Sequence, residues 1–314
     1  MIPALVLTAG LATRLRPLSF VRAKAAMPVA GEPLVRRILL QLRSQGVIDA
    51  VLNLHHLPQT ITGVIGDGSD LGIAVRYSWE TPILGSAGGP RHALPILDAA
   101  TFLVVNGDTL TNVDLGCLQE DHERHGTLVT MAVVPNVRPE AYGGVVVDSD
   151  GAVTGFVPRG SATRSYHFVG VQVVEADAFA SLRPGTPAES VGALYPALIK
   201  DRPGSVRASV SAADFLDIGT PSDYLRTSLL LSSREKSAPR HGARTRVDPT
   251  ARVEDSVLWD DVEIEGGAML RECVVADGTR VPAETSWVGV TLRPAGGALA
   301  PGERRVGDLA IASL

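Results

Sequence analysis

The sequence predicts an α/β protein over its first two-thirds, followed by a short β-helix. Continuous apolar runs such as residues 4–8 are typical of strands that are buried on both faces. Segments with helical periodicity separate these runs, and strands that alternate with helices predict an α/β sheet with right-handed crossovers. After about residue 232, apolar residues recur six apart, which indicates a coil with one short strand on each side.

The strands are expected from their apolar content. One helix is expected after Pro33, where apolar residues recur at helical spacing until Gly46 offers a stop. A second helix is expected after Thr220, because Thr-Pro-Ser-Asp has the order of an N-cap, a proline at the first helical position and an acid in the first turn. The expected strands cover residues 4–8, 51–54, 73–77, 102–106, 128–134, 144–147 and 168–174.

Three parts of the chain are predicted from these patterns. Residues 1–232 are expected to form one α/β domain, and the polar residues 233–245 a linker. Residues 246–314 are expected to form the β-helix and a tail that caps it. The six-residue spacing joins Val247, Val253 and Trp259, and after one five-residue step it joins Ile264, Leu270 and Ala276.

Composition limits the class of protein. The chain has 314 residues, is 45% hydrophobic and carries a formal net charge of −5, with no basic stripe of the kind that binds nucleic acid. Its two cysteines, Cys117 and Cys273, lie far apart, so neither a zinc site nor a disulfide is expected. The apolar start is too short for a signal peptide, and no run approaches the roughly 18 apolar residues of a membrane span. We therefore expect a cytoplasmic protein with neither a nucleic-acid nor a membrane partner.

A turn of small residues follows the first strand, at Gly10-Leu11-Ala12-Thr13-Arg14. Small side chains let backbone N–H groups approach a phosphate closely, and Arg14 and Arg16 add positive charge. The sequence here has neither the GxxxxGK[ST] of a P-loop nor the GxGxxG of a dinucleotide fold. Taken alone, this turn is equally consistent with an ordinary connection between a strand and a helix.

Further motifs follow this turn in a fixed order. The motifs are Ala23-Lys24-Ala25-Ala26-Met27-Pro28-Val29, Glu80 with Leu84-Gly85-Ser86-Ala87-Gly88-Gly89, Asn106-Gly107-Asp108, Tyr142-Gly143-Gly144-Val145 and Phe215-Leu216-Asp217-Ile218-Gly219-Thr220-Pro221. Together they resemble the sugar-1-phosphate nucleotidylyltransferase family over about residues 3 to 230. In the tail, Gly267-Ala268, Cys273-Val274-Val275 and Asp277-Gly278 resemble the β-helix of the mannose-1-phosphate guanylyltransferase branch of that family.

The resemblance implies a Rossmann-like, mixed and mostly parallel sheet of the nucleotidyltransferase type, followed by a short left-handed β-helix. It also implies a reaction in which a sugar-1-phosphate oxygen attacks the α-phosphorus of a nucleoside triphosphate and pyrophosphate leaves. Such a reaction depends mainly on positioning and on neutralising charge. Mg²⁺ is the implied cofactor, because it prefers oxygen ligands and keeps several waters.

The resemblance also implies a role for each matching residue. Asp108 and Asp217 would hold Mg²⁺, Arg14 would neutralise the leaving pyrophosphate, and Lys24 would place a point charge near the reacting phosphate. Gly143 and Arg159 would approach the sugar phosphate. The nucleotide would be bound by Ala9, Gly10, Leu11, Ala12, Thr13, Glu80, Gly85, Gly88 and Asn106.

The sequence departs from the family pattern at several positions. Ala12 replaces a glycine, and its methyl group is tolerable only if φ is negative. Val157-Pro158-Arg159-Gly160 stands where the family has Glu-Lys-Pro, and Phe168-Val169 stands where it has an asparagine before Gly170. Most of these changes fall on the sugar side, so we expect an active enzyme with an unusual sugar-phosphate acceptor.

Several functions stay open on the sequence alone. GTP and a mannose-1-phosphate-like sugar are favoured because the tail resembles the guanylyltransferase branch. A uridylyltransferase or adenylyltransferase that acts on another sugar-1-phosphate is one alternative. A regulatory subunit that binds nucleotide-sugar without turnover is another. The exposed edge of a β-helix can pair with another chain, so a homo-oligomer through the C-terminal β-helix is also expected.

Overall fold

Packing divides the computed structural model of the chain into two units, each made of two separate stretches of sequence. The structure describes residues 1–235, 241–296 and 298–314. The first unit comprises residues 1–10 and 38–216, and the second comprises residues 11–37 and 217–314. The linker predicted at residues 233–245 includes residues 236–240, which lie outside the described residues.

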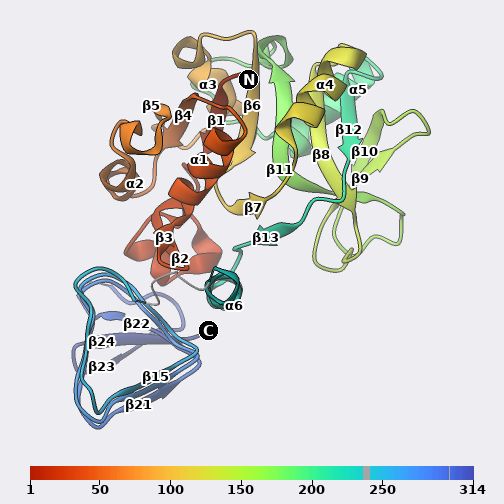
Figure 1. Cartoon of the computed structure of the whole chain (residues 1–314). Helices are drawn as coiled ribbons and strands as arrows, with labels where there is room; N and C mark the ends of the chain where they lie inside the picture. Colours follow the sequence, from red (N-terminus) through yellow and green to blue (C-terminus); the bar gives the residue numbers. More distant parts are fainter. Residues whose placement is uncertain (236–240, 297) are drawn as a thin grey trace. The chain divides into compact units, whose positions relative to one another are not determined.

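A nine-stranded mixed sheet forms the centre of the first unit (Figure 1). Its strands are β1 (Ala4–Leu7), β4 (Asp49–Leu54), β5 (Ala74–Trp79), β6 (Thr101–Asn106), β8 (Val129–Pro135), β9 (Gly144–Val147), β10 (Val153–Val157), β11 (Tyr166–Glu175) and β12 (Val206–Val210). The order is β10-β9-β11-β6-β1-β4-β5, and β8 lies between β11 and β12. β6, β1, β4 and β5 are parallel, whereas β11 runs antiparallel to β6. The seven strands predicted from the sequence are present, and their ends are shifted by at most two residues.

The order in which the chain adds parallel strands to the sheet reverses at β1. The chain passes from β1 to β4 and β5 on one side, then returns to β6 on the other side of β1. Loops at the carboxyl ends of β1 and β6 therefore diverge. In open α/β sheets, this arrangement leaves a crevice at the strand ends where ligands bind.

Helices α1 (Leu34–Ser44), α2 (Pro58–Ile65), α3 (Gly85–Leu97), α4 (Leu115–His125), α5 (Tyr195–Asp201) and α6 (Pro221–Arg234) complete the α/β pattern. Within the first unit, α3 lies against β1, β4 and β5, and α4 lies against β8 and β11. The predicted start of α6 is confirmed. The Thr220 hydroxyl accepts a hydrogen bond from the Asp223 N–H at 3.2 Å, and the Asp223 carboxylate accepts one from the Thr220 N–H at 3.1 Å.

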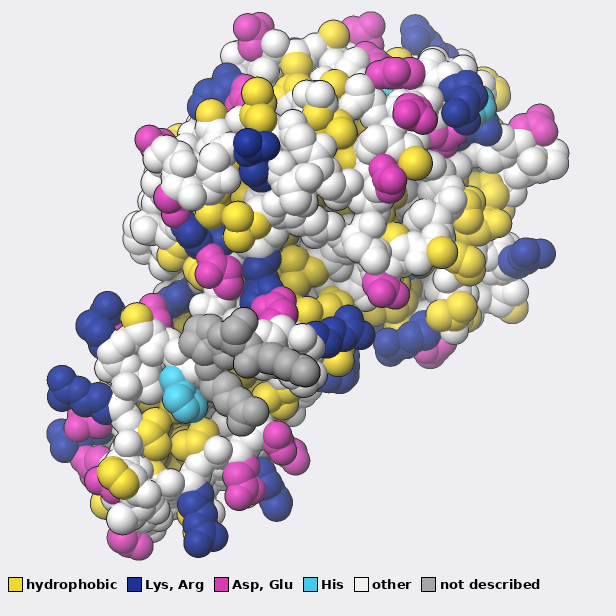
Figure 2. All heavy atoms as spheres, viewed as in Figure 1, with side chains coloured by type: hydrophobic (Ala, Val, Ile, Leu, Met, Phe, Trp, Pro, Cys, Tyr) yellow, Lys and Arg dark blue, Asp and Glu magenta, His cyan; other side chains and the backbone are white. Residues whose placement is uncertain are grey.

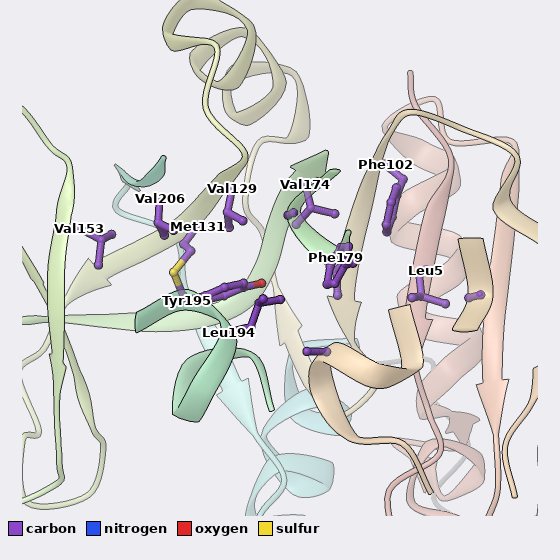
Figure 3. Packing of buried hydrophobic residues seen from close by; sticks show 14 of the residues in the cluster. Leu5, Phe102, Val129, Met131, Val153, Val174, Phe179, Leu194, Tyr195 and Val206 are labelled. Atoms are coloured by element: carbon purple, nitrogen blue, oxygen red, sulfur yellow. The ribbon is translucent and has the colours of Figure 1, made fainter. Parts of the chain in front are cut away.

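The core of the first unit is aliphatic, with a few aromatic rings at its centre (Figure 3). Phe102 of β6 stacks on Phe179, with ring centroids 6.1 Å apart. Tyr195 packs beside Leu194 and Met131 and is fully buried. Burial of one such side chain stabilises the fold by about 1.5–3 kcal/mol. This core therefore holds in place the strands whose loops lie at the crevice.

The second unit begins with residues 11–37, which form short turns instead of long elements. Three 3₁₀ turns cover Thr13–Leu15, Leu18–Phe20 and Lys24–Ala26. A small ribbon of β2 (Pro28–Val29) and β3 (Glu32–Pro33) follows. These residues share their packing unit with α6 and with the C-terminal coil.

The C-terminal coil is three-sided, with one short strand on each side per turn (Figure 1). The strands are β14 (Arg246–Val247), β15 (Arg252–Glu254), β16 (Val257–Leu258), β17 (Glu263–Ile264), β18 (Met269–Arg271), β19 (Val274–Val275), β20 (Arg280–Val281), β21 (Ser286–Val288) and β22 (Val290–Pro294). Paired residues such as Arg246, Glu263 and Arg280 lie 17 apart, because each turn has two six-residue sides and one five-residue side. The predicted six-residue period with a five-residue step is therefore confirmed, but the step falls between Val253 and Leu258, not between Trp259 and Ile264.

One side of the coil differs from the predicted pattern. Val253, Ile264 and Leu270 face the interior as expected. Leu258 and Val275 fill the third side, and Trp259 is not part of this interior cluster. Trp259 is fully buried against Tyr224 of α6, with ring centroids 6.1 Å apart. The prediction for Trp259 was wrong because a large aromatic residue is buried by a neighbouring element as readily as by the coil itself.

The last residues extend one sheet of the coil. β23 (Arg304–Val306) and β24 (Leu309–Ser313) form a hairpin, and β24 pairs antiparallel with β22. This pairing satisfies the edge of β22 with the chain's own backbone. The tail therefore caps one of the three sheets, as expected.

The surface carries charges of both signs. On the face seen in Figure 2, basic and acidic side chains are interspersed over both units. Among the described residues, no helix is long and apolar enough to cross a membrane.

Candidate functional site

A pocket of about 210 Å³ lies at the carboxyl ends of β1, β4 and β6 in the first unit. Parallel strands end at the same edge of a sheet, which brings together loops that are far apart in sequence. The pocket is lined by Leu7, Ala9, Gly10, Asn53, Glu80, Ile83, Gly85, Ser86, Asn106 and Asp108. Six of these were predicted as site residues, namely Ala9, Gly10, Glu80, Gly85, Asn106 and Asp108.

A buried hydrogen-bond bridge between Asn53 and Glu80 holds two loops of this pocket. The side-chain oxygen Oδ1 of Asn53 accepts from the backbone N–H of Thr8 at 2.6 Å and of Ala9 at 3.3 Å. The Asn53 amide donates to Glu80 Oε1 at 2.7 Å, and Glu80 Oε2 accepts from the Leu84 N–H at 2.8 Å. Both side chains are buried, so each lost bond would leave a costly unsatisfied group. The bridge ties the loop after β1 to the start of α3.

Asn53 was not predicted from the sequence. The available signal was an amide in a strand that is otherwise apolar, at residues 51–54. A buried amide requires hydrogen-bond partners, so such a residue indicates a polar network near a strand end. Which partners it finds depends on loops that are distant in sequence.

Glycines bring α3 close to a second segment of the first unit. A Cβ atom on Gly88 would lie 2.5 Å from the Thr186 carbonyl oxygen, and one on Gly85 would lie 2.8 Å from the Ala188 carbonyl oxygen. Gly85 also has a φ of +76°, which glycine adopts without strain. Gly85 lines the pocket, whereas Gly88 serves this close packing.

Asn106, Gly107 and Asp108 end β6 at the pocket. The Gly107 N–H donates to the Leu7 carbonyl at 3.0 Å, and a Cβ there would lie 2.5 Å from that oxygen. Only glycine therefore fits between the ends of β6 and β1. This contact directs the partly buried Asp108 carboxylate to the pocket, where it accepts a hydrogen bond from Thr109 Oγ1 at 3.2 Å.

The two residues predicted for the sugar side flank the open end of the hairpin of β9 and β10. A Cβ on Gly143 would lie 3.1 Å from the Val157 carbonyl oxygen and 3.9 Å from the backbone nitrogen of Arg159. The sequence did not predict an aromatic cluster beside them. The ring of His167 lies 4.3 Å from that of Tyr142 and 4.6 Å from that of Phe215. Burial lowers the pKa of His167, which favours its neutral form.

In the second unit, the turn after Gly10 has a strained residue. Ala12 adopts φ 47° and ψ 45°, which is the left-handed region. The expectation of a negative φ was therefore wrong. The carbonyl of Ala12 accepts from the Leu15 N–H at 2.9 Å, so the 3₁₀ turn holds the residue in this conformation. The left-handed conformation costs a non-glycine residue about 1–2 kcal/mol.

The side chains of Arg14 and Asp217 both lie close to Gly219 in the second unit. A Cβ on Gly219 would lie 3.2 Å from Asp223 Oδ2, 3.4 Å from Asp217 Oδ2 and 3.5 Å from Arg14 Nη1. The absence of a side chain at Gly219 leaves this point open. Lys24 lies in the third 3₁₀ turn and is partly buried. Leu11, Thr13 and Arg14 are exposed.

The carboxylates suit a hard divalent cation. Among the described residues, no group of three or more His, Cys, Asp or Glu side chains could hold a metal ion by itself. Mg²⁺ commonly binds through one or two carboxylates together with waters and substrate phosphates. Asp108 and Asp217, each partly buried at a strand end, are donors of the required kind.

Two family models match the chain. The model described as "Nucleotidyl transferase" matches residues 3–234, and the model described as "GlmU-like, C-terminal hexapeptide" matches residues 241–293. The chain is 30% identical to the mannose-1-phosphate guanylyltransferase of Mycobacterium tuberculosis, over 90% of this chain and 82% of that one. It is 28% identical to the UTP–glucose-1-phosphate uridylyltransferase of Synechocystis, over 88% of this chain and 76% of that one.

A solved structure has the same fold. The structure of HddC from Yersinia pseudotuberculosis matches with a TM-score of 0.65 at 23% identity, over 74% of this chain and 100% of that one. This chain belongs to the nucleotidyl transferase family. The predicted enzyme class is confirmed, as is the α/β nucleotidyltransferase fold with a C-terminal β-helix of the left-handed hexapeptide type.

The strain at Ala12 gives a first prediction. Ala12→Gly should raise the free energy of unfolding by about 0.5–1 kcal/mol, since relief of strain exceeds the entropy that glycine adds to the unfolded chain. Urea denaturation measures the change. Ala180→Gly is the matched control, because Ala180 has φ −60° and is exposed; it should be neutral or destabilising. Equal effects of both substitutions would contradict the account of Ala12.

The bridge between Asn53 and Glu80 gives a second prediction. Glu80→Gln replaces one acceptor oxygen by an NH₂ group that faces a donor, and should lower the free energy of unfolding by about 1–3 kcal/mol. Glu189→Gln is the control, because Glu189 is exposed and accepts a hydrogen bond from Ser86 at 2.8 Å. A Glu80→Gln variant as stable as the control would show that the bridge does not hold the loops.

Proposed function

We propose that this enzyme transfers a nucleotidyl group from a nucleoside triphosphate to a sugar-1-phosphate, giving a nucleotide-sugar and pyrophosphate. The pocket at the ends of β1, β4 and β6 carries the proposal. Small residues, amide side chains and carboxylates line it, in a chain of the nucleotidyl transferase family. These are the groups that a phosphorylated ligand and its counter-ion require.

In the proposed reaction, a phosphate oxygen of the sugar-1-phosphate attacks the α-phosphorus. The bond from the α-phosphorus to the bridging oxygen breaks, and that oxygen leaves with pyrophosphate. Both reactants are anions, so the protein must hold them in line and offset their repulsion. No covalent intermediate with the protein is needed.

The nucleotide is assigned to the pocket and to the turn that follows β1. Backbone groups of Ala9, Gly10, Leu11, Ala12 and Thr13 would bind the triphosphate. Small residues before Leu11 support this assignment, because they let a phosphate approach the backbone. The base and ribose would lie along Glu80, Gly85, Gly88 and Asn106.

The bridge changes the role proposed for Glu80. Both of its carboxylate oxygens already accept hydrogen bonds, from Asn53 and Leu84. Glu80 therefore acts by fixing the walls of the nucleotide site. Gly88 acts similarly, because it allows α3 to pack closely.

Two basic residues and a cation held by two carboxylates are assigned to the phosphates. Arg14 would neutralise the leaving pyrophosphate, and Lys24 would lie near the reacting phosphate. Asp108 and Asp217 would hold a divalent cation, proposed as Mg²⁺. The bound ion would supply positive charge that lowers the repulsion between the two reactants.

The acceptor is assigned to the hairpin that carries Gly143 and Arg159. Arg159 is exposed, so its guanidinium group could contact a phosphate. Tyr142, which precedes Gly143, forms an aromatic cluster with His167 and Phe215. It gives this region an apolar surface that suits the face of a sugar ring.

The preferred pair is GTP with a mannose-1-phosphate-like sugar, supported by the guanylyltransferase relative and the β-helix. The uridylyltransferase relative supports UTP with another sugar-1-phosphate as the second candidate. A homo-oligomer through the β-helix is also part of the proposal. The exposed Met269 and Val288 on the outer face of β18 and β21 support it.

Pyrophosphate release tests the proposal. Four nucleoside triphosphates should be assayed against a panel of sugar-1-phosphates with Mg²⁺ present. We expect release, with GTP and mannose-1-phosphate highest; a UTP maximum would favour the second candidate. Release with no pair would contradict the proposal and favour a regulatory subunit that binds nucleotide-sugar.

Asp108→Asn tests the metal assignment. Loss of one charged ligand should lower kcat by about 100-fold or more, while the circular dichroism spectrum stays unchanged. Asp150→Asn is the control, because Asp150 is exposed in a turn of the same unit. Full activity of Asp108→Asn would remove Asp108 from the site.

A further inference from the structure

Arg22 lies two residues before Lys24 and bonds to two acids of the β-helix, all within the second unit. Its Nε donates to Asp277 Oδ2 at 2.6 Å, and its Nη2 donates to Asp277 Oδ1 at 2.8 Å and to Asp260 Oδ2 at 2.6 Å. The Arg22 side chain is only 12% exposed. Asp260 and Asp277 occupy equivalent positions on successive turns of the coil. We call Arg22, Asp260 and Asp277 the Arg22 cluster.

The acids of the Arg22 cluster are themselves fixed by the backbone of the coil. Asp277 Oδ1 accepts from the Asp260 N–H at 3.0 Å, and Asp260 Oδ1 accepts from the Ala243 N–H at 2.7 Å. Three successive turns are thereby linked through these carboxylates. The acids therefore present a preorganised site to the guanidinium group, and little side-chain entropy remains to be lost.

A second contact fixes the other side of Lys24. The Tyr224 hydroxyl donates to the Pro28 carbonyl oxygen and accepts from Trp259 Nε1 at 2.8 Å. Tyr224 and Trp259 are fully buried, and the Arg22 guanidinium carbon lies 5.5 Å from the centre of the Trp259 ring. The β-helix thus holds the chain at Arg22 directly and at Pro28 through Tyr224.

The residues between these two points form a rigid segment. The Ala26 N–H donates to the Ala23 carbonyl at 2.8 Å, and the Met27 N–H donates to the Lys24 carbonyl at 3.1 Å. Ala23, Ala26 and Met27 are buried. A displacement at either end would therefore move the Lys24 backbone, because no flexible residue lies between.

A gain in folding stability does not by itself explain the ion pairs of the Arg22 cluster. Taking the mostly buried Arg22 guanidinium group out of water costs free energy, and well-packed apolar residues often replace such groups without loss. Hydrogen bonds of fixed direction specify an orientation that apolar contacts do not. Burial lowers the pKa of Arg22, but its bonds to Asp277 and Asp260 outweigh burial and raise it, so the guanidinium stays charged.

We propose that the β-helix is a positioning element for the nucleotidyl transfer reaction, acting through the Arg22 cluster and the Tyr224–Trp259 pair to set the position of Lys24. This inference rests on the proposed function, because it assumes that Lys24 contacts the reacting phosphate. Arg22, Asp277 and Tyr224 are positioning residues, since they act through Lys24. A displacement of about 1 Å at such a group costs up to about 100-fold in rate.

The chain offers a matched control for this test. Arg244 and Asp261 form another ion pair across one turn of the same coil, with both bonds at 2.6 Å. Their side chains are 69% and 50% exposed. Arg244→Ala thus also removes a two-bond ion pair between an arginine and an aspartate, but an exposed one made within the coil itself.

The variants are Asp277→Asn, Arg22→Lys and Tyr224→Phe, in the full chain. Each should lower kcat by about tenfold or more, with a smaller change in KM, while Arg244→Ala leaves kcat unchanged. In a chain that already carries Lys24→Ala, Asp277→Asn should have little further effect, because both changes remove the same contribution. Additive losses in the double variant would contradict the inference.

A second measurement needs no turnover. The sequence has three lysines, Lys24, Lys200 and Lys236, so acetylation of Lys24 by an amine-reactive ester can be followed by mass spectrometry against the exposed Lys200. The ratio of Lys24 to Lys200 labelling should change in Asp277→Asn and Tyr224→Phe and stay at the wild-type value in Arg244→Ala. Variants that lower Tm but leave kcat and the ratio unchanged would overturn the inference.

These readouts separate the two proposals. If the wild-type protein releases no pyrophosphate with any pair, the proposed function fails, and labelling still tests whether the β-helix places Lys24. If the wild type is active and Lys24→Ala is impaired, but Asp277→Asn equals the wild type in rate and labelling, the proposed function stands and only the positioning role is wrong.

Discussion

The hydrogen-bond bridge between Asn53 and Glu80 is the interaction on which the pocket at the ends of β1, β4 and β6 depends. The parallel strands β1, β4 and β6 end at one edge of the sheet, but their loops would separate without a link between them. Asn53 holds the backbone at Thr8 and Ala9, and Glu80 holds the start of α3. A buried amide and carboxylate satisfy each other and the N–H groups of three loop residues only in one arrangement, which makes the pocket rigid before a ligand binds. The glycines at 85 and 107 follow from the same constraint, because the backbones they carry approach others too closely for a side chain.

The residues assigned to catalysis come from two packing units that alternate along the chain. The chain leaves the first unit after Gly10, returns at Ile38, and leaves it again after Leu216. Ala9, Gly10, Glu80 and Asp108 belong to the first unit, whereas Arg14, Lys24 and Asp217 belong to the second. The second unit also contains the β-helix, so the coil packs with the segment that carries Lys24. The Arg22 cluster is the contact through which we propose that the C-terminal domain affects catalysis.

The sequence predicted the strands, the helix cap at Thr220 and the coil repeat because each depends on local chemistry or on a simple period. Six predicted residues line the pocket because ordered family motifs mark strand ends. Asn53, the aromatic cluster of Tyr142, His167 and Phe215, and the Arg22 cluster were not predicted, since each joins residues far apart in sequence. Two expectations were wrong for physical reasons. Hydrogen bonds of the 3₁₀ turn hold Ala12 at a positive φ, and Trp259 is buried by α6 and not by the interior of the coil.

The location of the nucleotide is the central claim, and equilibrium binding of a fluorescent nucleoside triphosphate to a pocket-filling variant tests it most directly. Ile83 lines the pocket and is partly exposed, so Ile83→Trp should fill the pocket without burying a polar group. Ile48→Trp is the control, because Ile48 is 62% exposed and does not line the pocket. The account predicts that Ile83→Trp weakens binding by about tenfold or more, the equivalent of about 1.4 kcal/mol, while Ile48→Trp binds like the wild type. Equal affinities of the wild type and both variants would contradict it.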